Sequence, residues 1–152
     1  MIAADARLRP AMVKAMIAHA AESSPREACG LIVYDGAGCP VRLYPTTNVH
    51  PDPDRFELDP VEHFGVVRDA DEHGWRIGAV YHSHPRGPAR PSATDLAAGI
   101  DPDWISFVIG RNRTATWVIR AYKMADGHAV PFGRSSVLTG HNAPRGGRNR
   151  PR

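Results

Sequence analysis

The spacing of apolar residues in the first third of the chain predicts one helix followed by two strands. Pro10 suits the first position of a helix, and Ser23 marks its end. Between them the apolar residues recur at three- and four-residue intervals on one helical face: Met12, Val13, Met16, Ile17 and Ala20. A nearly continuous apolar run over 28–34 predicts a strand buried on both faces, and a turn leads to a second strand near 41–44.

A second amphipathic helix is expected after a loop rich in proline and aspartate. Residues 56–58 look extended, Asp59 and Pro60 form a helix cap and first position, and Gly74 ends the helix. Three-residue spacing gives this helix an apolar stripe that we expect to face the core: Val61, Phe64, Val67 and Ala70.

The second half of the chain alternates strands with one further helix. Strands are expected at 77–82, 104–109, 115–123 and 128–132, and a helix opens at Ser92 and runs to about residue 100. The turn residues at 110–113 predict a hairpin between the middle two strands. Together the elements predict an α/β or α+β fold with a single mixed β-sheet flanked by helices.

Composition fits one ordinary globular domain of 152 residues, with 42% hydrophobic and 23% charged residues. No apolar run approaches the roughly 18 residues that a membrane span needs, and the amino end lacks the features of a signal peptide. We therefore expect a cytoplasmic protein without a membrane partner, in which Cys29 and Cys39 form no disulfide.

The net charge of +3 invites a nucleic-acid-binding interpretation, but the basic residues are unevenly placed. Residues 140–152 contain four arginines, no acid and no large apolar side chain, so we expect a disordered tail there and a folded domain over 1–139. Without the tail, fifteen basic residues face sixteen acidic ones, a net charge of −1. The basic balance therefore predicts no specific nucleic-acid partner.

A constellation of histidines and carboxylates carries the clearest chemical signal. His82 and His84 stand two positions apart at the end of a predicted strand, so their side chains point to the same face. Asp95 follows in the first turn of the predicted helix, where the chain can fold back toward the imidazoles. Two imidazoles and one carboxylate suit zinc and leave its fourth position to water. Glu27, at the lip of the first buried strand, can serve as the general base.

Each residue also has a simpler interpretation. A lone pair of histidines at this spacing is a weak metal signal, Ser92 with Asp95 is equally a helix cap, and Glu27 alone would be a surface acid. The combination of all of these features is much harder to obtain by chance.

The combination resembles the JAMM metalloproteases, whose motif is a distant glutamate, His-Ser/Thr-His, seven residues and Ser-x-x-Asp. This chain reads His82-Ser83-His84, residues 85–91, and then Ser92-Ala-Thr-Asp95, without departure. The segment from Pro25 to Leu31, which contains the glutamate, is also similar to the family's, and the shared order of elements extends over residues 8–132. The resemblance implies the JAMM/MPN fold, which is similar to the cytidine-deaminase-like architecture.

The resemblance also implies roles for individual residues. His82, His84 and Asp95 would bind one Zn²⁺, and Glu27 would activate the water in the fourth position and then protonate the leaving amine. Ser92 would hydrogen-bond the developing oxyanion. Ser83 is expected to be structural, and Cys29 an inert core thiol rather than a nucleophile.

The resemblance further implies a zinc metallopeptidase or isopeptidase that cleaves an amide bond at the C-terminal Gly-Gly of a ubiquitin-like protein. The short connections favour the small bacterial members, some of which act on sulfur carrier proteins. Arg86 and Arg90 flank the site, where they can meet an acidic substrate or simply be solvated loop arginines. The alternatives are a non-catalytic MPN-type binding module and, with less support, a cupin-like metal-dependent enzyme.

Overall fold

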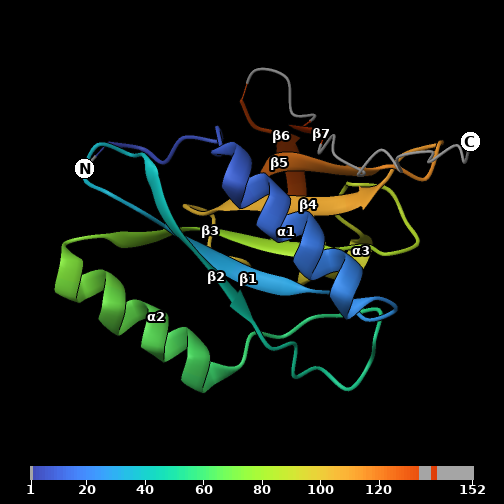
Figure 1. Ribbon diagram of the computed structural model, residues 1–152, viewed down its shortest axis with the longest axis horizontal. Coiled ribbons are helices and arrows are strands. Elements are labelled where there is room, and N and C mark those ends of the chain that lie inside the picture. Colours follow the sequence, from blue (N-terminus) through green and yellow to red (C-terminus); the bar gives the residue numbers. More distant parts are fainter. Residues whose placement is uncertain (1, 134–137, 140–152) are drawn as a thin grey trace, which may run out of the picture.

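The computed structural model describes residues 2–133 and 138–139, which form a mixed sheet with three helices (Figure 1). The expected tail at 140–152 lies outside the described residues. The helices are α1 (Pro10–Ser23), α2 (Pro60–His73) and α3 (Ala93–Ala97). The strands are β1 (Cys29–Tyr34), β2 (Pro40–Thr46), β3 (Arg76–Ser83), β4 (Ile105–Arg111), β5 (Trp117–Ala125), β6 (His128–Pro131) and β7 (Leu138–Thr139). Among the described residues, no helix is long and apolar enough to cross a membrane.

The sheet has the order β2-β1-β3-β4-β5-β6, and β7 pairs with β5 beside β6. Among the described strands only the β3–β4 pair is parallel, because α3 and its flanking loops carry the chain back across the sheet between these two strands. All other neighbours are antiparallel, so the expectation of a single mixed sheet is confirmed.

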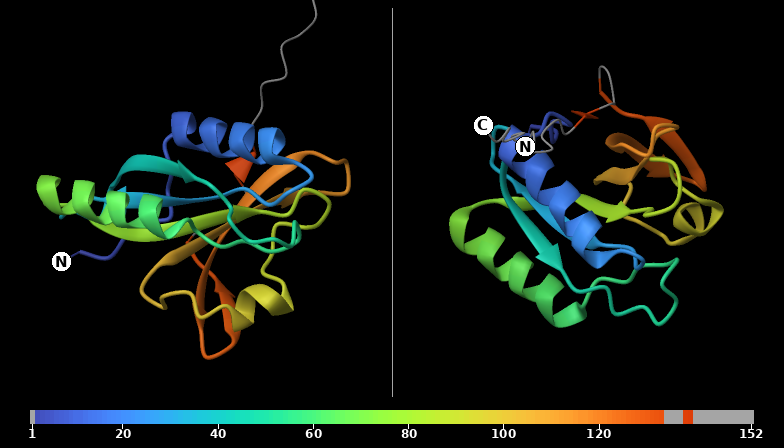
Figure 2. Two further views of the ribbon diagram at one scale, coloured as in Figure 1. Left: turned by 90° about the horizontal axis from the view of Figure 1, so that it is seen from below. Right: turned by 45° about the vertical axis from the view of Figure 1, so that its right-hand side comes forward.

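The helices lie on both faces of the sheet (Figure 2). Along β1, Ile32 and Tyr34 join a core cluster with Met16 of α1, whereas Leu31 and Val33 face the other way and pack with α2. This alternation buries all six positions of β1, as predicted for a strand covered on both sides. The helix α3 lies opposite α1, beyond the ends of β3 and β4 (Figure 2).

The predicted stripe of α2 is wrong at three of its four positions. Val61, Phe64 and Val67 are exposed, at 81%, 64% and 36%, whereas Ala70 is buried against the sheet as expected, together with Val66 from outside the stripe. Polar residues explain the difference, because the docked side of α2 also carries Glu62 and Asp69. Glu62 accepts hydrogen bonds from the backbone and side chain of Thr47, and Asp69 accepts bonds from Arg42 and Tyr44 of β2. The face of α2 that packs on the sheet therefore combines apolar and polar side chains, and a prediction from hydrophobicity alone chose a stripe that is mostly exposed.

The helix α3 is shorter than predicted. It begins after Ser92 as expected, but it ends at Ala97 rather than near Ile100. Gly99 adopts a left-handed conformation, with φ at +68°, which cannot continue a right-handed helix. The side chain of Ile100 instead packs against the clusters beneath α2 and α3.

Candidate metal centre

The sheet register brings the two halves of the predicted site together. Cys29 at the start of β1 pairs with His82 near the end of β3, so Glu27, just before β1, lies beside the histidines. Because β3 and β4 are parallel, the chain must cross over between them, and this connection, which contains α3, begins at the end of β3 beside the histidines. His82 shares its face of the sheet with Val80 and Val108, on the side occupied by α3.

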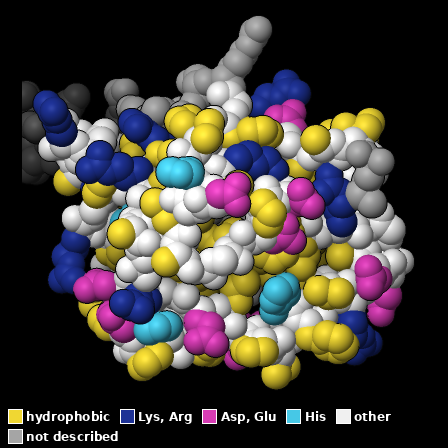
Figure 3. Space-filling model, turned by 180° about the vertical axis from the view of Figure 1, so that it is seen from behind, with side chains coloured by type: hydrophobic (Ala, Val, Ile, Leu, Met, Phe, Trp, Pro, Cys, Tyr) yellow, Lys and Arg dark blue, Asp and Glu magenta, His cyan; other side chains and the backbone are white. Residues whose placement is uncertain are grey.

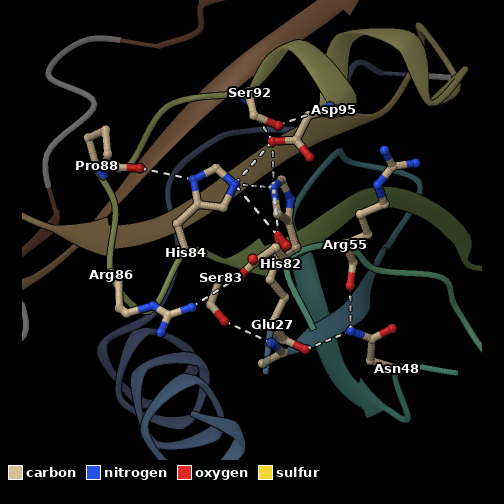
Figure 4. A network of polar contacts seen from close by, with 12 residues as sticks. Glu27, Asn48, Arg55, His82, Ser83, His84, Arg86, Pro88, Ser92 and Asp95 are labelled. Atoms are coloured by element: carbon tan, nitrogen blue, oxygen red, sulfur yellow. Dashed lines mark hydrogen bonds and ion pairs between the residues drawn. The ribbon is translucent and has the colours of Figure 1, made fainter. Parts of the chain in front are cut away.

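Three of the predicted ligand atoms converge at almost equal separations (Figure 4). Nε2 of His82 lies 3.0 Å from Oδ2 of Asp95, and Nε2 of His84 lies 3.1 Å from the same oxygen. The two Nε2 atoms are 3.1 Å apart. His82 is fully buried and Asp95 is 5% exposed, whereas the side chain of His84 is 15% exposed and borders a pocket.

Glu27 faces this cluster from the opposite side. Its Oε1 lies 3.7 Å from Nε2 of His84 and 4.0 Å from Nε2 of His82, and the residue is only 3% exposed. Among the described residues this buried oxygen has no hydrogen-bond partner. Leaving a buried carboxylate oxygen unpaired is costly, so the arrangement fits a group that binds between Glu27 and the histidines.

The donor set fits a zinc ion. The ligand atoms of Glu27, His82, His84 and Asp95 all lie within 4.8 Å of one another. A tetrahedral zinc with ligands at about 2.0–2.1 Å would separate its ligand atoms by about 3.3 Å. The histidine and aspartate atoms already stand close to that spacing, and the longer distances to Glu27 leave room for a small molecule between them. These residues can therefore hold a metal with three ligands and one open position.

Surrounding groups fix the orientation of the two imidazoles. Nδ1 of His84 donates to the carbonyl oxygen of Pro88 at 3.0 Å, which leaves Nε2 of a neutral ring free to bind a metal. His82 is held by its stacked contact with Phe56, with the ring centroids 4.5 Å apart. The side chain of Asn48 donates to the carbonyl oxygen of Glu27 and thereby ties the loop before α2 to the site. Neither Pro88, Phe56 nor Asn48 was singled out from the sequence.

The loop at 85–91 is held in place by β4 and β5. Gly110 of β4 allows the loop to pass closely, since a Cβ atom there would lie 2.3 Å from the backbone nitrogen of Ala89. The backbone of Arg111 donates to Gly87, and the hydroxyl of Tyr122 donates to the carbonyl oxygen of Ala89. The segment that carries the Pro88 carbonyl is thus anchored to the sheet on two sides.

Ser92 caps α3 in the structure. Its Oγ accepts from the backbone of Asp95 at 3.1 Å, and its own backbone donates to Oδ2 of Asp95 at 2.8 Å. The simpler interpretation of Ser92 and Asp95 as a capping pair is therefore correct. It is also compatible with a site role, because the hydroxyl proton of Ser92 remains available and the residue lines the same pocket as Glu27 and His84.

Ser83 and Cys29 adjoin the cluster and are both buried. Oγ of the buried Ser83 accepts from the backbone of Ala28 at 2.8 Å and so joins the ends of β1 and β3. Burial raises the pKa of the Cys29 thiol to about 11, which keeps it protonated and unreactive near neutral pH.

The charges within the cluster shift its titration. Burial raises the pKa of Glu27 to about 7, with a further contribution from the negative charge of Asp95 and an opposing one from His84. Burial would also raise the pKa of Asp95, but hydrogen bonds from His82 and His84 outweigh it and hold that pKa well below its usual range. Burial lowers the pKa of His82, which favours the neutral form of its ring. A carboxylate, a neutral imidazole and an acid poised near neutrality are suited to metal binding and proton transfer.

The fold and this cluster match a known family. Residues 9–124 match the family described as prokaryotic homologs of the JAB domain, and the chain belongs to this family, whose members carry the JAMM/MPN fold.

The relatives are similar over most of their length. The chain is 32% identical over 121 residues to the CysO-cysteine peptidase of Mycobacterium tuberculosis, covering 79% of this chain and 83% of that protein. It is 32% identical over 115 residues to a probable TtuB-protein conjugate cleaving protease of Thermus thermophilus, covering 74% and 72%. The solution structure of a Desulfitobacterium hafniense protein superposes with a TM-score of 0.70 at 32% identity, covering 79% of this chain and 84% of that one.

Proposed function

We propose that this protein is a zinc metallopeptidase that hydrolyses an amide bond after the C-terminal Gly-Gly of a ubiquitin-like sulfur carrier protein. The observation that carries the proposal is Glu27, whose unpartnered Oε1 lies 3.7 Å and 4.0 Å from the two Nε2 atoms of the buried cluster. The similarity to a CysO-cysteine peptidase and to a probable conjugate-cleaving protease supports the same chemistry.

In this proposal, His82, His84 and Asp95 hold the zinc. When bound, the metal supplies Lewis acidity that polarises the scissile carbonyl and makes a water more acidic. Glu27 accepts the proton of the attacking water, for which a pKa near 7 is well suited, and then returns it to the leaving amine. The hydroxyl of Ser92 donates a hydrogen bond to the oxyanion of the tetrahedral intermediate, while its Oγ continues to accept the hydrogen bond that caps α3. We assign these functions to residues 1–139.

The alternatives receive less support. A non-catalytic binding module has no need of a complete set of converging ligand side chains, which this chain contains. A cupin-like enzyme would require a nearly all-strand chain, whereas helices flank the mixed sheet in the part of the chain that the structure describes. On the side opposite α1, basic and acidic side chains are interspersed rather than gathered in one basic patch (Figure 3).

Intact-mass spectrometry tests the proposal. A Gly-Gly-ended carrier protein from the same genome is extended by one residue and incubated with the zinc-loaded enzyme. The expected result is loss of that residue, with the product ending at Gly-Gly. Glu27→Gln is expected to retain zinc and lose the cleavage, because the amide cannot accept the proton. Absence of cleavage across several such carriers would favour the binding module.

A further inference from the structure

An open pocket adjoins the metal centre on the side of Glu27. It has a volume of about 480 Å³, within the range of roughly 300–1,000 Å³ that is usual for small-molecule sites. Its lining includes Glu27, His84 and Ser92 of the site, the two cationic side chains of Arg86 and Arg90, and the carboxylate of Asp54. A separate hollow beyond Asp95 is lined by Phe56 and α3 and does not include Glu27.

The leaving amine must depart through the pocket that Glu27 lines. This step rests on the proposed function, in which Glu27 hands its proton to that amine. A proton is transferred only across hydrogen-bond distance, so the amine nitrogen lies next to Glu27 when the bond breaks. Whatever is attached to the amine then occupies this pocket, next to Arg86 and Arg90.

The two arginines are available for a new partner. Arg90 forms no ion pair with another described residue, and the side chain of Arg86 meets Asp54 at 3.4 Å in a pair whose two members are each 73% exposed. An exposed pair of this kind contributes little stability, so an arriving anion can replace or share it at small cost. Figure 4 shows Arg86 extending from the loop beneath His84 toward the part of the site where Glu27 lies.

We infer that Arg86 and Arg90 bind the α-carboxylate of a single amino acid that leaves from the carrier. In an α-amino acid the carboxylate is two bonds from the amine, so an amine beside Glu27 places the carboxylate within the same pocket. Guanidinium groups match the planar, two-oxygen geometry of a carboxylate. A lysine side chain of a conjugated protein, or the next residue of a longer peptide, would bring no anion to this position.

The loop that carries Arg86 and Arg90 is restrained at several points. Pro85, Pro88 and Pro91 recur along the loop, and its backbone is anchored to β4 and β5. The arginines therefore project from a supported backbone, which reduces the entropy lost when they bind a carboxylate.

Three forms of one substrate test the inference. The carrier is extended by one residue that ends in a free carboxylate, by the same residue as its primary amide, or by an isopeptide bond to the side chain of Nα-acetyl-lysine amide. We expect kcat/KM to be roughly 10- to 100-fold higher for the free acid than for the amide, as for a hydrogen bond to a charged group. The lysine conjugate should be no better than the amide.

Variants assign the preference to the arginines. In Arg86→Gln/Arg90→Gln the ratio of acid to amide should fall to near one, whereas Arg68→Gln, an exposed arginine on α2, should keep the wild-type ratio. A second measurement compares binding of the two carrier forms to Glu27→Gln protein, which does not cleave them. The form that ends in a free carboxylate should bind more tightly than the amide form, and this difference should disappear when Arg86 and Arg90 are also replaced. Equal cleavage of acid and amide by the wild type would overturn this inference and leave the proposed function intact. Cleavage of no form would contradict the proposed function, and the inference with it.

Discussion

Replacement of Glu27 by glutamine in the metal-free protein probes the buried carboxylate at the centre of the site. Glutamine has the shape of the protonated acid but cannot ionise. Burial raises the pKa of Glu27 from an ordinary value of 4.5 to about 7 in the folded state. The folded protein therefore retains this proton over a pH range in which the unfolded chain has released it.

The sign and size of the effect follow from linkage. Because the folded pKa is raised, the contribution of Glu27 to stability is fully present below about pH 4.5 and is lost as pH rises through about 7. At about 1.36 kcal/mol for each pH unit, the wild type loses about 3 kcal/mol over this window through Glu27 alone. Glu27→Gln escapes this loss, so at pH 8 we expect the variant to be more stable than the wild type by up to about 3 kcal/mol, relative to their difference at pH 4.5.

Urea denaturation in the presence of a chelator measures this difference at both pH values. Glu72→Gln, at an exposed position of α2, reports the effect of removing a surface carboxylate under the same conditions. A stability difference between Glu27→Gln and wild type that does not change with pH would refute the placement of Glu27 in a buried cluster.

The remaining predictions concern the cap and the two sides of α2. Ser92→Ala should lower the free energy of unfolding by about 1 kcal/mol through loss of the cap, and reduce kcat by about 100-fold or more through loss of the donor to the oxyanion. Ser92→Thr should restore most of the stability in urea denaturation and most of the activity in turnover assays. If the turnover of Ser92→Ala falls no further than its folded fraction, a catalytic role of Ser92 is excluded. Phe64→Ser should change the stability by less than about 0.5 kcal/mol, whereas Val66→Ala should cost about 2 kcal/mol. Equal destabilisation by these two changes would contradict the orientation of α2.

The convergence of His82, His84 and Asp95 could be predicted because it depends on local geometry. Two residues at i and i+2 of a strand share a face whatever the rest of the fold does, and Ser92 with Asp95 closes a capping box within a single turn. The proximity of Glu27 to His82 needed the pairing of β1 with β3, which hydrophobic patterning did not predict; the resemblance implied only that Glu27 acts at the same site.

Other features depended on contacts that leave no periodic signal. The side of α2 that docks is decided by hydrogen bonds from Glu62 and Asp69 to β2 and the loop after it, so the more apolar side is the exposed one. The acceptor for His84 is the backbone carbonyl of Pro88, an atom that every residue possesses. The stacking of Phe56 on His82 joins positions that are distant in sequence and lie in different elements.

Zinc content is the most direct test of the central claim that these residues form a metal centre. The protein is stripped with a chelator, reloaded with excess zinc, desalted and measured by inductively coupled plasma mass spectrometry beside His84→Ala. His84 is the least buried of the three proposed ligands, so its replacement disturbs packing less than that of His82. We expect one zinc for each wild-type chain and a large loss in the variant. A wild type without zinc, or a variant that retains as much as the wild type, would contradict the account.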